Sequence, residues 1–441
     1  MEKRAILSLV AEWQNRILKI EGIERDYESA LRSMIGAKPI KIITGFRRSG
    51  KSFLVQRVAK KLVADGLFPI SNILYLNFED FRLAGVNTPE KAYEIYTTFR
   101  TEMADQSKKL LIFDEVQNVM NWDRLIRTLY ETDQDIEILL TGSNSELLSS
   151  EIGSRLAGRF IEISILPFDF REYLRYKGAE PEDLMAFHRN HEPIRNHFHA
   201  YMKFGGLPEI LTIQDENARF SYIEGIVSKV ILDDIIRRFH IKHSTALERI
   251  FFYLLSAAGN LVSFRRISNY LKLMDIHMKQ ETVILYVQYI LKAFAMYEIN
   301  KFDWKLGKVF ATTRKYYSVD TGLINLYPPA VSNFSHQLEN VVFLQLRRRQ
   351  KLISFGALSS GKEIDFIARG ANGKIEKFQV TQVLSENNYE RELAPFQLQG
   401  TSLETGKNLL LTLDGDDQEI QFKDSKVSQK NLIGWLLDLD P

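Results

Sequence analysis

The chain has 441 residues, 45% hydrophobic and 26% charged, a composition typical of a soluble globular protein of roughly two to four domains. The net charge is only +2, which excludes a general affinity for polyanions, so a nucleic-acid surface must come from local basic clusters. The absence of cysteine excludes disulfides and thiolate metal sites and agrees with a cytoplasmic location.

Residues 1–37 are predicted to be helical, with a break at Gly22. The amino-terminal sequence MEKRAILSLVAEWQNR has charges at both ends of a short apolar stretch and no small-residue cleavage site. We therefore interpret it as an amphipathic helix and not as a signal peptide. No uninterrupted apolar run approaches the roughly 18 residues that a membrane helix needs, so we expect no membrane span.

The strongest motif of the chain follows an apolar run at Ile40–Ile43, which is predicted to be a buried strand. The motif precedes a helical pattern, and it fits G-x-x-x-x-G-K-[ST] at every fixed position. It reads Gly45-Phe46-Arg47-Arg48-Ser49-Gly50-Lys51-Ser52. The two glycines let the backbone wrap around phosphate oxygens, and the loop N–H groups and the helix N-terminus present positive charge to them.

The side chains of this loop have predicted roles in binding ATP and Mg²⁺. Lys51 would reach the β- and γ-phosphates, and the Ser52 hydroxyl would bind Mg²⁺. Phe53 begins the following helix and is included in the predicted nucleotide site. We therefore predict an ATP site over residues 45–53.

Four further apolar runs are predicted strands, and helical segments separate them. They cover residues 72–78, 109–113, 136–140 and 160–165. Strands that alternate with helices are typical of a parallel sheet covered on both faces. The predicted fold class is α/β, with a P-loop NTPase sheet.

Two carboxylates, Asp114 and Glu115, end the strand at 109–113. An apolar strand that ends in acids is the second element that a phosphate-binding loop requires. We expect Asp114 to hold Mg²⁺, directly or through water, and Glu115 to polarise the attacking water as general base.

Polar residues also follow the next two segments. Ser143 and Asn144 end the strand at 136–140, where Asn144 would orient the water near the γ-phosphate or the pair would simply cap the next helix. Arg159 precedes the last strand, a position that faces the neighbouring subunit's nucleotide in a ring. It is the predicted arginine finger, with Arg155 as the competitor.

The order of these elements resembles that of AAA-type ATPases. The motif from Gly45 to Ser52, Leu156-Ala157-Gly158-Arg159, Leu166-Pro167-Phe168 and Gly205-Gly206-Leu207-Pro208-Glu209 are similar to those of prokaryotic AAA-type ATPases with a carboxyl-terminal domain long described as of unknown function. Archaeal ATPases with a nuclease-like tail are relatives. The resemblance covers nearly the whole chain and implies an ATPase core that assembles as a homo-oligomeric ring.

The segment at 244–328 is predicted to be a winged helix. Residues 263–273 and 280–294 read as helix, turn, helix, and a hairpin at 297–317 follows. Thr282, Tyr289 and Lys292 lie opposite the apolar face of the second helix and suit a major groove. The basic hairpin residues suit DNA phosphates, and they are Lys301, Lys305, Lys308, Arg314 and Lys315.

The last segment resembles a PD-(D/E)xK nuclease fold in its spacing. Glu339 lies on a predicted helix and Asp365 on a strand, and the E-x-K place reads Gln379-Val380-Thr381. Since the second carboxylate and the lysine are both missing, we expect a degenerate nuclease site that binds DNA and does not cut it.

The predicted domains are a helical segment at 1–37, an ATPase core at 38–166, a helical lid at 167–243, a winged helix at 244–328 and an α/β restriction-endonuclease-like domain at 329–441. The predicted function is ATP-dependent remodelling of DNA, with branched or single-stranded DNA as the candidate substrate. The alternative is a signalling NTPase whose winged helix and tail recruit protein partners.

Overall fold

The computed structural model describes residues 2–143, 156, 158–303, 308–326, 334–349, 351–357, 363–370, 373–397 and 405–439. The chain divides into two compact units, Met1–Ile165 and Leu166–Pro441. None of the helices in the described ranges is long and apolar enough to cross a bilayer.

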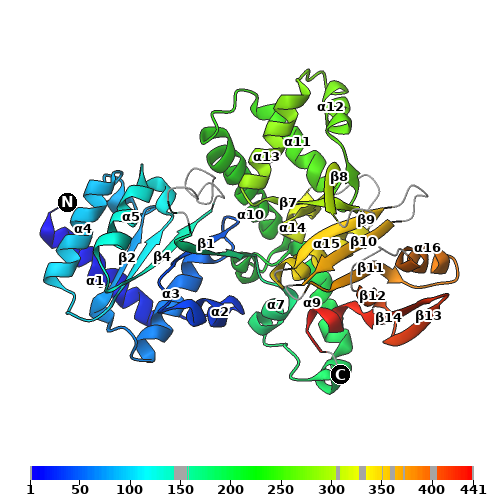
Figure 1. Ribbon diagram of the computed structural model, residues 1–441, viewed down its shortest axis with the longest axis horizontal. Helices are drawn as coiled ribbons and strands as arrows, with labels where there is room; N and C mark the ends of the chain where they lie inside the picture. The colour runs from blue at the N-terminus through cyan, green and yellow to red at the C-terminus, as the bar shows by residue number, and fades with distance from the viewer. Residues whose placement is uncertain are drawn as a thin grey trace. The chain divides into compact units, whose positions relative to one another are not determined.

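The amino-terminal unit is built on a five-stranded sheet of order β2-β3-β4-β1-β5, in which every pair is parallel (Figure 1). The strands are β1 (Ile40–Gly45), β2 (Ile73–Asn77), β3 (Lys109–Asp114), β4 (Ile136–Gly142) and β5 (Phe160–Ile165). Strands covered on both faces read as continuous apolar runs, which is why the sequence pattern located them. The predicted parallel α/β sheet is confirmed.

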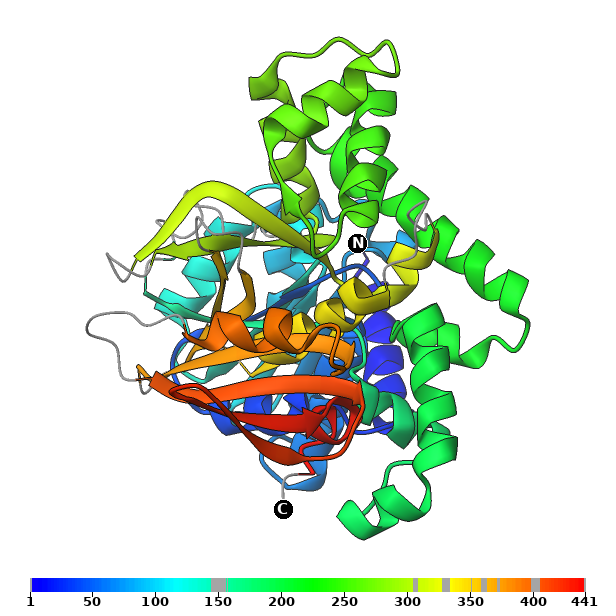
Figure 2. The ribbon, with the colours of Figure 1, turned by 90° about the vertical axis from the view of Figure 1, so that its right-hand side faces the viewer.

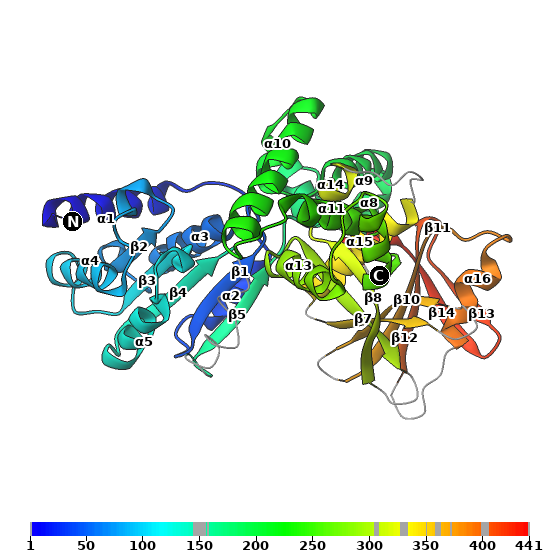
Figure 3. The ribbon, with the colours of Figure 1, turned by 90° about the horizontal axis from the view of Figure 1, so that it is seen from above.

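Helices cover both faces of this sheet, and Figure 3 shows α3 and α5 on opposite sides of it. The helices are α1 (Lys3–Lys19), α2 (Tyr27–Met34), α3 (Lys51–Ala64), α4 (Pro89–Glu102) and α5 (Trp122–Thr132). The buried apolar face of α1 includes Ile6, Val10 and Ile17, and its side chains join the same core as the strands. The predicted amphipathic helix therefore packs into the core of the amino-terminal unit.

The carboxyl-terminal unit contains a nine-stranded mixed sheet of order β13-β14-β12-β11-β10-β9-β7-β8-β6 (Figure 2). The strands are β6 (Leu261–Val262), β7 (Met296–Asp303), β8 (Lys308–Ser318), β9 (Leu352–Ala357), β10 (Glu363–Arg369), β11 (Ile375–Val383), β12 (Thr405–Asp414), β13 (Gln418–Phe422) and β14 (Ser425–Asn431).

The helices of this unit precede the sheet strands in the chain or lie between and after them. They are α7 (Phe170–Lys177), α8 (Leu184–Arg189), α9 (His191–Phe204), α10 (Glu216–Lys229), the π-helix at Val230–Arg237, α11 (Ser244–Ser256), α12 (Phe264–Lys272), α13 (Gln280–Lys292), α14 (Thr321–Leu326), α15 (Phe334–Arg348), α16 (Tyr389–Leu393) and α17 (Leu432–Leu436).

The hairpin β7–β8, predicted as a wing, continues into the sheet of the predicted tail domain. Strand β7 pairs in parallel with β9, with Lys301 opposite Phe355 and Phe302 opposite Gly356. The boundary that we expect after residue 328 thus falls inside one sheet.

The turn at Gly205-Gly206 is held by a buried carboxylate, Asp320. The N–H groups of Gly206 and Gly322 donate to Asp320 over 2.7 and 2.9 Å. A Cβ at Gly205, whose φ is +80°, would lie 1.7 Å from Asp320 Oδ1, and one at Gly206 would lie 2.1 Å from the Phe168 carbonyl oxygen. Both positions require glycine, which explains the Gly-Gly turn signal in the sequence.

Asp320 makes the stability of this unit depend on pH. Burial raises the pKa of Asp320 from its ordinary 3.8 to about 6, against the two backbone hydrogen bonds that lower it. The fold therefore favours the protonated acid, and its stabilising contribution is present below pH 3.8 and is lost as the pH rises through about 6.

We expect Asp320→Asn to remove this dependence, because the amide does not titrate. The free energy of unfolding of the variant, relative to wild type, should rise by about 2 kcal/mol between about pH 4.5 and pH 7.5. Urea denaturation of both proteins across this pH range measures the difference between their free energies of unfolding. The other titrating groups are the same in both proteins, so their contributions cancel in this difference. A difference that stays constant with pH would contradict the assignment.

Candidate functional site

Three strand ends carry the polar residues of the candidate nucleotide site. Strand β4 lies between β1 and β3, with Thr44 opposite Gly142 and Phe113 opposite Leu140. Because the strands are parallel, the loop after β1, the acids after β3 and the polar end of β4 meet at one edge of the sheet. This edge is where open α/β sheets bind ligands.

The loop after β1 has the backbone of a phosphate-binding turn. Gly45 has φ +149° and a Cβ there would lie 2.3 Å from the Ile165 carbonyl oxygen, while Gly50 has φ +95°. Lys51 Nζ donates to the carbonyl oxygens of Gly45 and Phe46 over 3.2 and 3.1 Å. The hydroxyl of Ser49 is buried and has no hydrogen-bond partner in the part of the chain that is described, which fits a loop built to receive another molecule.

The remaining predicted loop residues differ in exposure. Phe46 is buried in the core, Arg47 pairs with Glu79 over 3.1 Å, and Arg48 is exposed in the left-handed region, at φ +65°. The structure therefore places the backbone of Phe46 and the side chain of Arg47 at the loop, and directs the phenyl ring of Phe46 into the protein.

Asp114 is fully buried at the centre of a hydrogen-bond network. Its carboxylate accepts hydrogen bonds from Ser52 Oγ over 3.0 Å, from Thr141 Oγ1 and from the Tyr75 hydroxyl. Burial raises the pKa of Asp114, as does the neighbouring Glu115, and the three hydrogen bonds oppose this shift. The structure thus brings together the two predicted metal ligands, Ser52 and Asp114.

Glu115 lies beside Lys51 and is held from two directions. Its backbone is left-handed, at φ +53°, and its N–H donates to Thr141 Oγ1 over 3.0 Å. Glu115 Oε2 accepts from Ser143 Oγ over 3.1 Å and from Gln117 Nε2, and Lys51 Nζ lies 3.7 Å from Oε1. Burial alone would raise the pKa of Glu115, but the Lys51 ammonium and these hydrogen bonds bring it below its usual value, so the acid is ionised.

Of the two residues considered at the end of β4, Ser143 contacts the carboxylate of Glu115, and Asn144 lies outside the described residues. The sequence did not indicate Thr141, Tyr75 or Gln117. Thr141 belongs to the polar strand end that the sequence displays. No sequence pattern indicates Tyr75 or Gln117 as site residues, because a tyrosine in an apolar strand and a glutamine in a turn are both common.

A second contribution that the sequence did not indicate comes from the segment at residues 20–28, which follows α1 and ends in the first turn of α2. Arg25 is buried, and its guanidinium donates to the Ser49 carbonyl oxygen over 2.9 Å. Glu28 accepts from Arg57 over 2.6 Å and pairs with Lys61 over 2.8 Å, both on α3. The segment thus fastens the phosphate loop and the helix that follows it.

Phe53 faces the same segment. A Cβ at Gly22 would lie 2.5 Å from Phe53 Cζ, so only glycine allows the backbone so close to the ring. The break predicted at Gly22 is therefore the place where the chain crosses α3.

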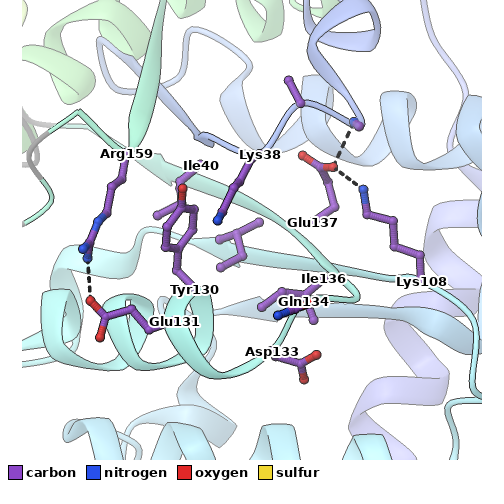
Figure 4. A pocket seen from close by; sticks show the side chains of 13 residues that line it. Lys38, Ile40, Lys108, Tyr130, Glu131, Asp133, Gln134, Ile136, Glu137 and Arg159 are labelled. Carbon is purple, nitrogen blue, oxygen red and sulfur yellow. Dashed lines mark hydrogen bonds and ion pairs between the residues drawn. The ribbon is translucent and has the colours of Figure 1, made fainter.

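Arg159 lines a cavity of about 680 Å³ at the other edge of the sheet (Figure 4). Its guanidinium pairs with Glu131 over 2.7 Å and lies 5.6 Å from the centre of the Tyr130 ring. Across the cavity, Glu137 accepts from Lys108 over 3.1 Å and from the Gly36 N–H over 2.9 Å.

Arg159 lies far from the candidate nucleotide site of the same chain. Its carbonyl accepts from the Ile40 N–H, at the first residue of β1, whereas the phosphate loop begins at Gly45, the last. At about 3.3 Å per residue the two ends of β1 are roughly 17 Å apart. Arg155, the competitor, lies outside the described residues.

The predicted DNA-binding residues of the hairpin do not share one exposed surface. The prediction that Lys315 binds DNA phosphates is wrong, because its side chain is only 2% exposed. Arg314 pairs with Glu298 over 3.4 Å and lies 4.7 Å from the centre of the Phe264 ring. Lys301 is half-buried, the side chain of Lys308 is not described, and Lys305 lies outside the described residues.

The outer face of α13 is also partly covered. The rings of Tyr289 and Phe239 stack with centroids 3.9 Å apart, and Lys292 Nζ lies 5.4 Å from the centre of Phe239. The side chains of Tyr289 and Lys292 were predicted to face a major groove of DNA. The ring of Phe239 covers part of the helix face that they share.

The predicted degenerate nuclease residues do meet, in a cavity of about 620 Å³. Glu339, Asp365, Gln379 and Thr381 all line it, together with Glu363. The structure adds Lys315 to this group. Burial raises the pKa of Asp365 well above its usual value, and the nearby Glu339 adds to the shift.

Lys377 lies two residues before Gln379 on β11, but it does not join the residues that line the cavity. Its ammonium donates to the Phe396 carbonyl oxygen over 3.2 Å, and burial lowers the pKa of Lys377 to about 8.

Parts of the chain are similar to two known families and to several solved structures. A family described as "AAA domain" matches residues 37–174, and one described as "Domain of unknown function (DUF8612)" matches residues 195–336. The Orc1 protein of Aeropyrum pernix, in complex with DNA, shares 12% identity over 76% of this chain and 97% of that one, at a TM-score of 0.31. DnaA of Aquifex aeolicus bound to AMPPCP shares 18% identity over 60% of this chain and 86% of that one, at a TM-score of 0.26.

Two curated relatives extend over most of the chain. An uncharacterized protein of Haemophilus influenzae is 32% identical over 370 residues, which are 83% of this chain and 88% of the relative. The uncharacterized protein MJ1544 of Methanocaldococcus jannaschii is 30% identical over 382 residues, 86% of this chain and 82% of the relative. The chain, with its AAA domain, belongs to the family of these two proteins.

Proposed function

We propose that the protein is an AAA+ ATPase that hydrolyses ATP in a homo-oligomeric ring and uses the reaction to remodel DNA. The observation that supports this best is the cluster at the carboxyl edge of the amino-terminal sheet. There, Lys51 lies beside an ionised Glu115, and Ser52 donates to Asp114.

In this mechanism Lys51 neutralises the β- and γ-phosphates, and the N-terminus of α3 adds positive charge. Glu115 accepts the proton of the attacking water, and its depressed pKa keeps it ready to do so at neutral pH. Ser143 and Gln117 fix the carboxylate through Oε2, so that Oε1 faces the Lys51 side of the site.

The residues present fit Mg²⁺. Ser52 Oγ and Asp114 Oδ1, only 3.0 Å apart, supply two hard oxygen ligands, and the phosphates of ATP and water complete such a shell. A bound Mg²⁺ would neutralise the charge that develops on the phosphate oxygens. It would also offset the cost of burying Asp114, whose pKa is raised by desolvation.

Two features support DNA as the substrate. The order α11, β6, α12, α13, β7, β8, with β8 between β6 and β7 in the sheet, matches the order expected of the proposed winged helix. Helix α12 and the turn after it expose four cations, which are Arg265, Arg266, Lys272 and Lys279. With Lys305 and Lys308 of the hairpin, they are our proposed contacts to DNA phosphates.

The second candidate is a switch that recruits a protein. Exposed apolar side chains on the same α12–α13 region favour it, since Leu273 is 87% exposed and Met274 and Leu285 are each 40% exposed. A protein partner would cover these side chains, whereas phosphate contacts would not require them.

A charge reversal separates the two candidates. We expect Lys305→Glu with Lys308→Glu to weaken DNA binding about equally for all sequences and to flatten the dependence of affinity on salt. Fluorescence anisotropy with labelled duplex, branched and single-stranded DNA over a range of salt concentrations measures both.

The matched control is Lys423→Glu with Lys426→Glu, which makes the same change in charge on exposed lysines of the β13–β14 hairpin. If the dependence of DNA affinity on salt is unchanged in the Lys305 and Lys308 variant, the hairpin is not part of the DNA interface. No measurable DNA binding at any salt concentration would favour the protein-recruiting switch.

A further inference from the structure

The cavity of the nuclease-like segment holds a buried ammonium among three carboxylates. Lys315 reaches it from β8, a strand of the hairpin. Its Nζ pairs with Glu363, lies 3.5 Å from Glu339 Oε2 and lies 3.9 Å from Asp365 Oδ1. One cation of this chain is therefore shared by acids of α15 and β10.

Two of these acids, Glu339 and Asp365, also contact other donors of the protein. Glu339 Oε1 contacts His336 Nδ1 at 2.8 Å, and Oε2 also accepts from the Tyr317 hydroxyl over 3.4 Å. Asp365 Oδ2 accepts from the Val380 N–H over 2.9 Å. The carboxylates are thus arranged around donors of the protein itself.

The position of the missing second carboxylate is closed in the same way. Gln379 Oε1 accepts from the Asp365 N–H over 3.3 Å, and its Nε2 donates to Glu392 over 3.0 Å. Both ends of the amide are used, so neither is directed at a cation in the cavity.

Nucleases of the resembled fold hold a divalent metal in this place, and the residues here do not fit one. A positive ammonium lies within 3.9 Å of all three acids, and it would repel a second cation strongly in a buried site. Among the described residues, no group of three His, Asp or Glu side chains is arranged to hold a metal ion.

We propose that Lys315 is a resident cation that takes the place of the divalent metal, so that this cavity excludes Mg²⁺ and Mn²⁺. The acids compensate the charge of Lys315. Their contacts with its ammonium hold strand β8 of the hairpin against α15 and β10. The inference is independent of whether the ATPase acts on DNA.

The proposal predicts that removing the ammonium opens a metal site. Lys315→Met replaces the ammonium by an uncharged chain of similar length to the lysine stem, and it leaves Glu339, Glu363 and Asp365 without their cation. In nucleotide-free protein, electron paramagnetic resonance titration with Mn²⁺ should find one more bound ion per chain in this variant than in wild type. The affinity of this additional site for Mn²⁺ should be at least about tenfold higher than that of any Mn²⁺ binding by the carboxyl-terminal unit of wild type.

Lys315→Met with Asp365→Asn is the control, and it should lose the additional ion. The melting temperature of Lys315→Met should lie below that of wild type and should rise with Mn²⁺, whereas the wild-type value should not change. Folded Lys315→Met that gains no Mn²⁺ site would overturn the proposal.

Wild type alone also tests the proposal, should Lys315→Met fail to fold. Wild type and Asp365→Asn are expected to bind the same number of Mn²⁺ ions, because the cavity is closed to them. A wild-type Mn²⁺ site that disappears in Asp365→Asn would show that Lys315 does not exclude the metal.

Discussion

Replacing Glu115 with glutamine is expected to lower the turnover of ATP by roughly a hundredfold or more, because a general base is lost. ATP binding should be retained. The amide has nearly the shape of the carboxylate and can still accept hydrogen bonds from Ser143 and Gln117, but it has no charge and cannot take a proton from water. A phosphate-release assay gives turnover, and a fluorescent ATP analogue gives affinity.

Lys51→Ala is the companion variant, and it should lose ATP binding itself, because Lys51 is the cation at the phosphate loop. Together, Glu115→Gln and Lys51→Ala distinguish the loss of ATP hydrolysis from the loss of ATP binding at one site. Wild-type turnover by Glu115→Gln would show that another group activates the water. Ser143→Ala should have a smaller effect than Glu115→Gln, since it removes only one of the contacts that orient the carboxylate.

The fold of the amino-terminal unit was predictable because each element has its own local signal. The continuous apolar runs of β1 and β3 are required by burial on both faces, and the turn after β1 requires glycine at Gly45 and Gly50. Asp114 and Glu115 follow an apolar strand, and the parallel order of the sheet brings them to the loop. The sequence therefore predicted which residues meet there.

The contacts that were missed depend on side chains from distant parts of the chain. Arg25 contacts the phosphate loop at Ser49, but in sequence it is one charge among several in a polar turn. Lys315 looked like one of several basic residues of a hairpin. Its burial is decided by the pairing of β7 with β9, which places the hairpin beside Glu339 and Asp365, and no local pattern encodes that pairing.

The register of β8 shows why charge alone was a poor guide. Arg314 and Lys315 are adjacent, so their side chains point to opposite faces of the strand. Arg314 faces Glu298 and the ring of Phe264, while Lys315 faces the acids of the cavity. A single-residue shift in this strand would exchange the two roles.

Arg159→Ala is expected to reduce ATP hydrolysis by roughly a thousandfold without weakening ATP binding, since an arginine finger acts on the charge of the transition state. Because Arg159 lies at the edge of the sheet opposite its own phosphate loop, the finger can act only on a neighbouring subunit. In the free subunit its guanidinium pairs with Glu131, so assembly must exchange this carboxylate for a phosphate. Glu131→Gln should make that exchange easier and should not lower turnover.

Mixing two inactive proteins tests this arrangement. Arg159→Ala retains a working nucleotide site, and Lys51→Ala retains the finger, so a site between them has every required group. In an equimolar random assembly roughly one interface in four should be active, because each of the two required subunits fills half of the positions. Phosphate release from the mixture, with each variant alone as the control, measures the recovery. If the mixed oligomers form and hydrolysis does not return, Arg159 is not the finger, and Arg155→Ala should then be put through the same complementation.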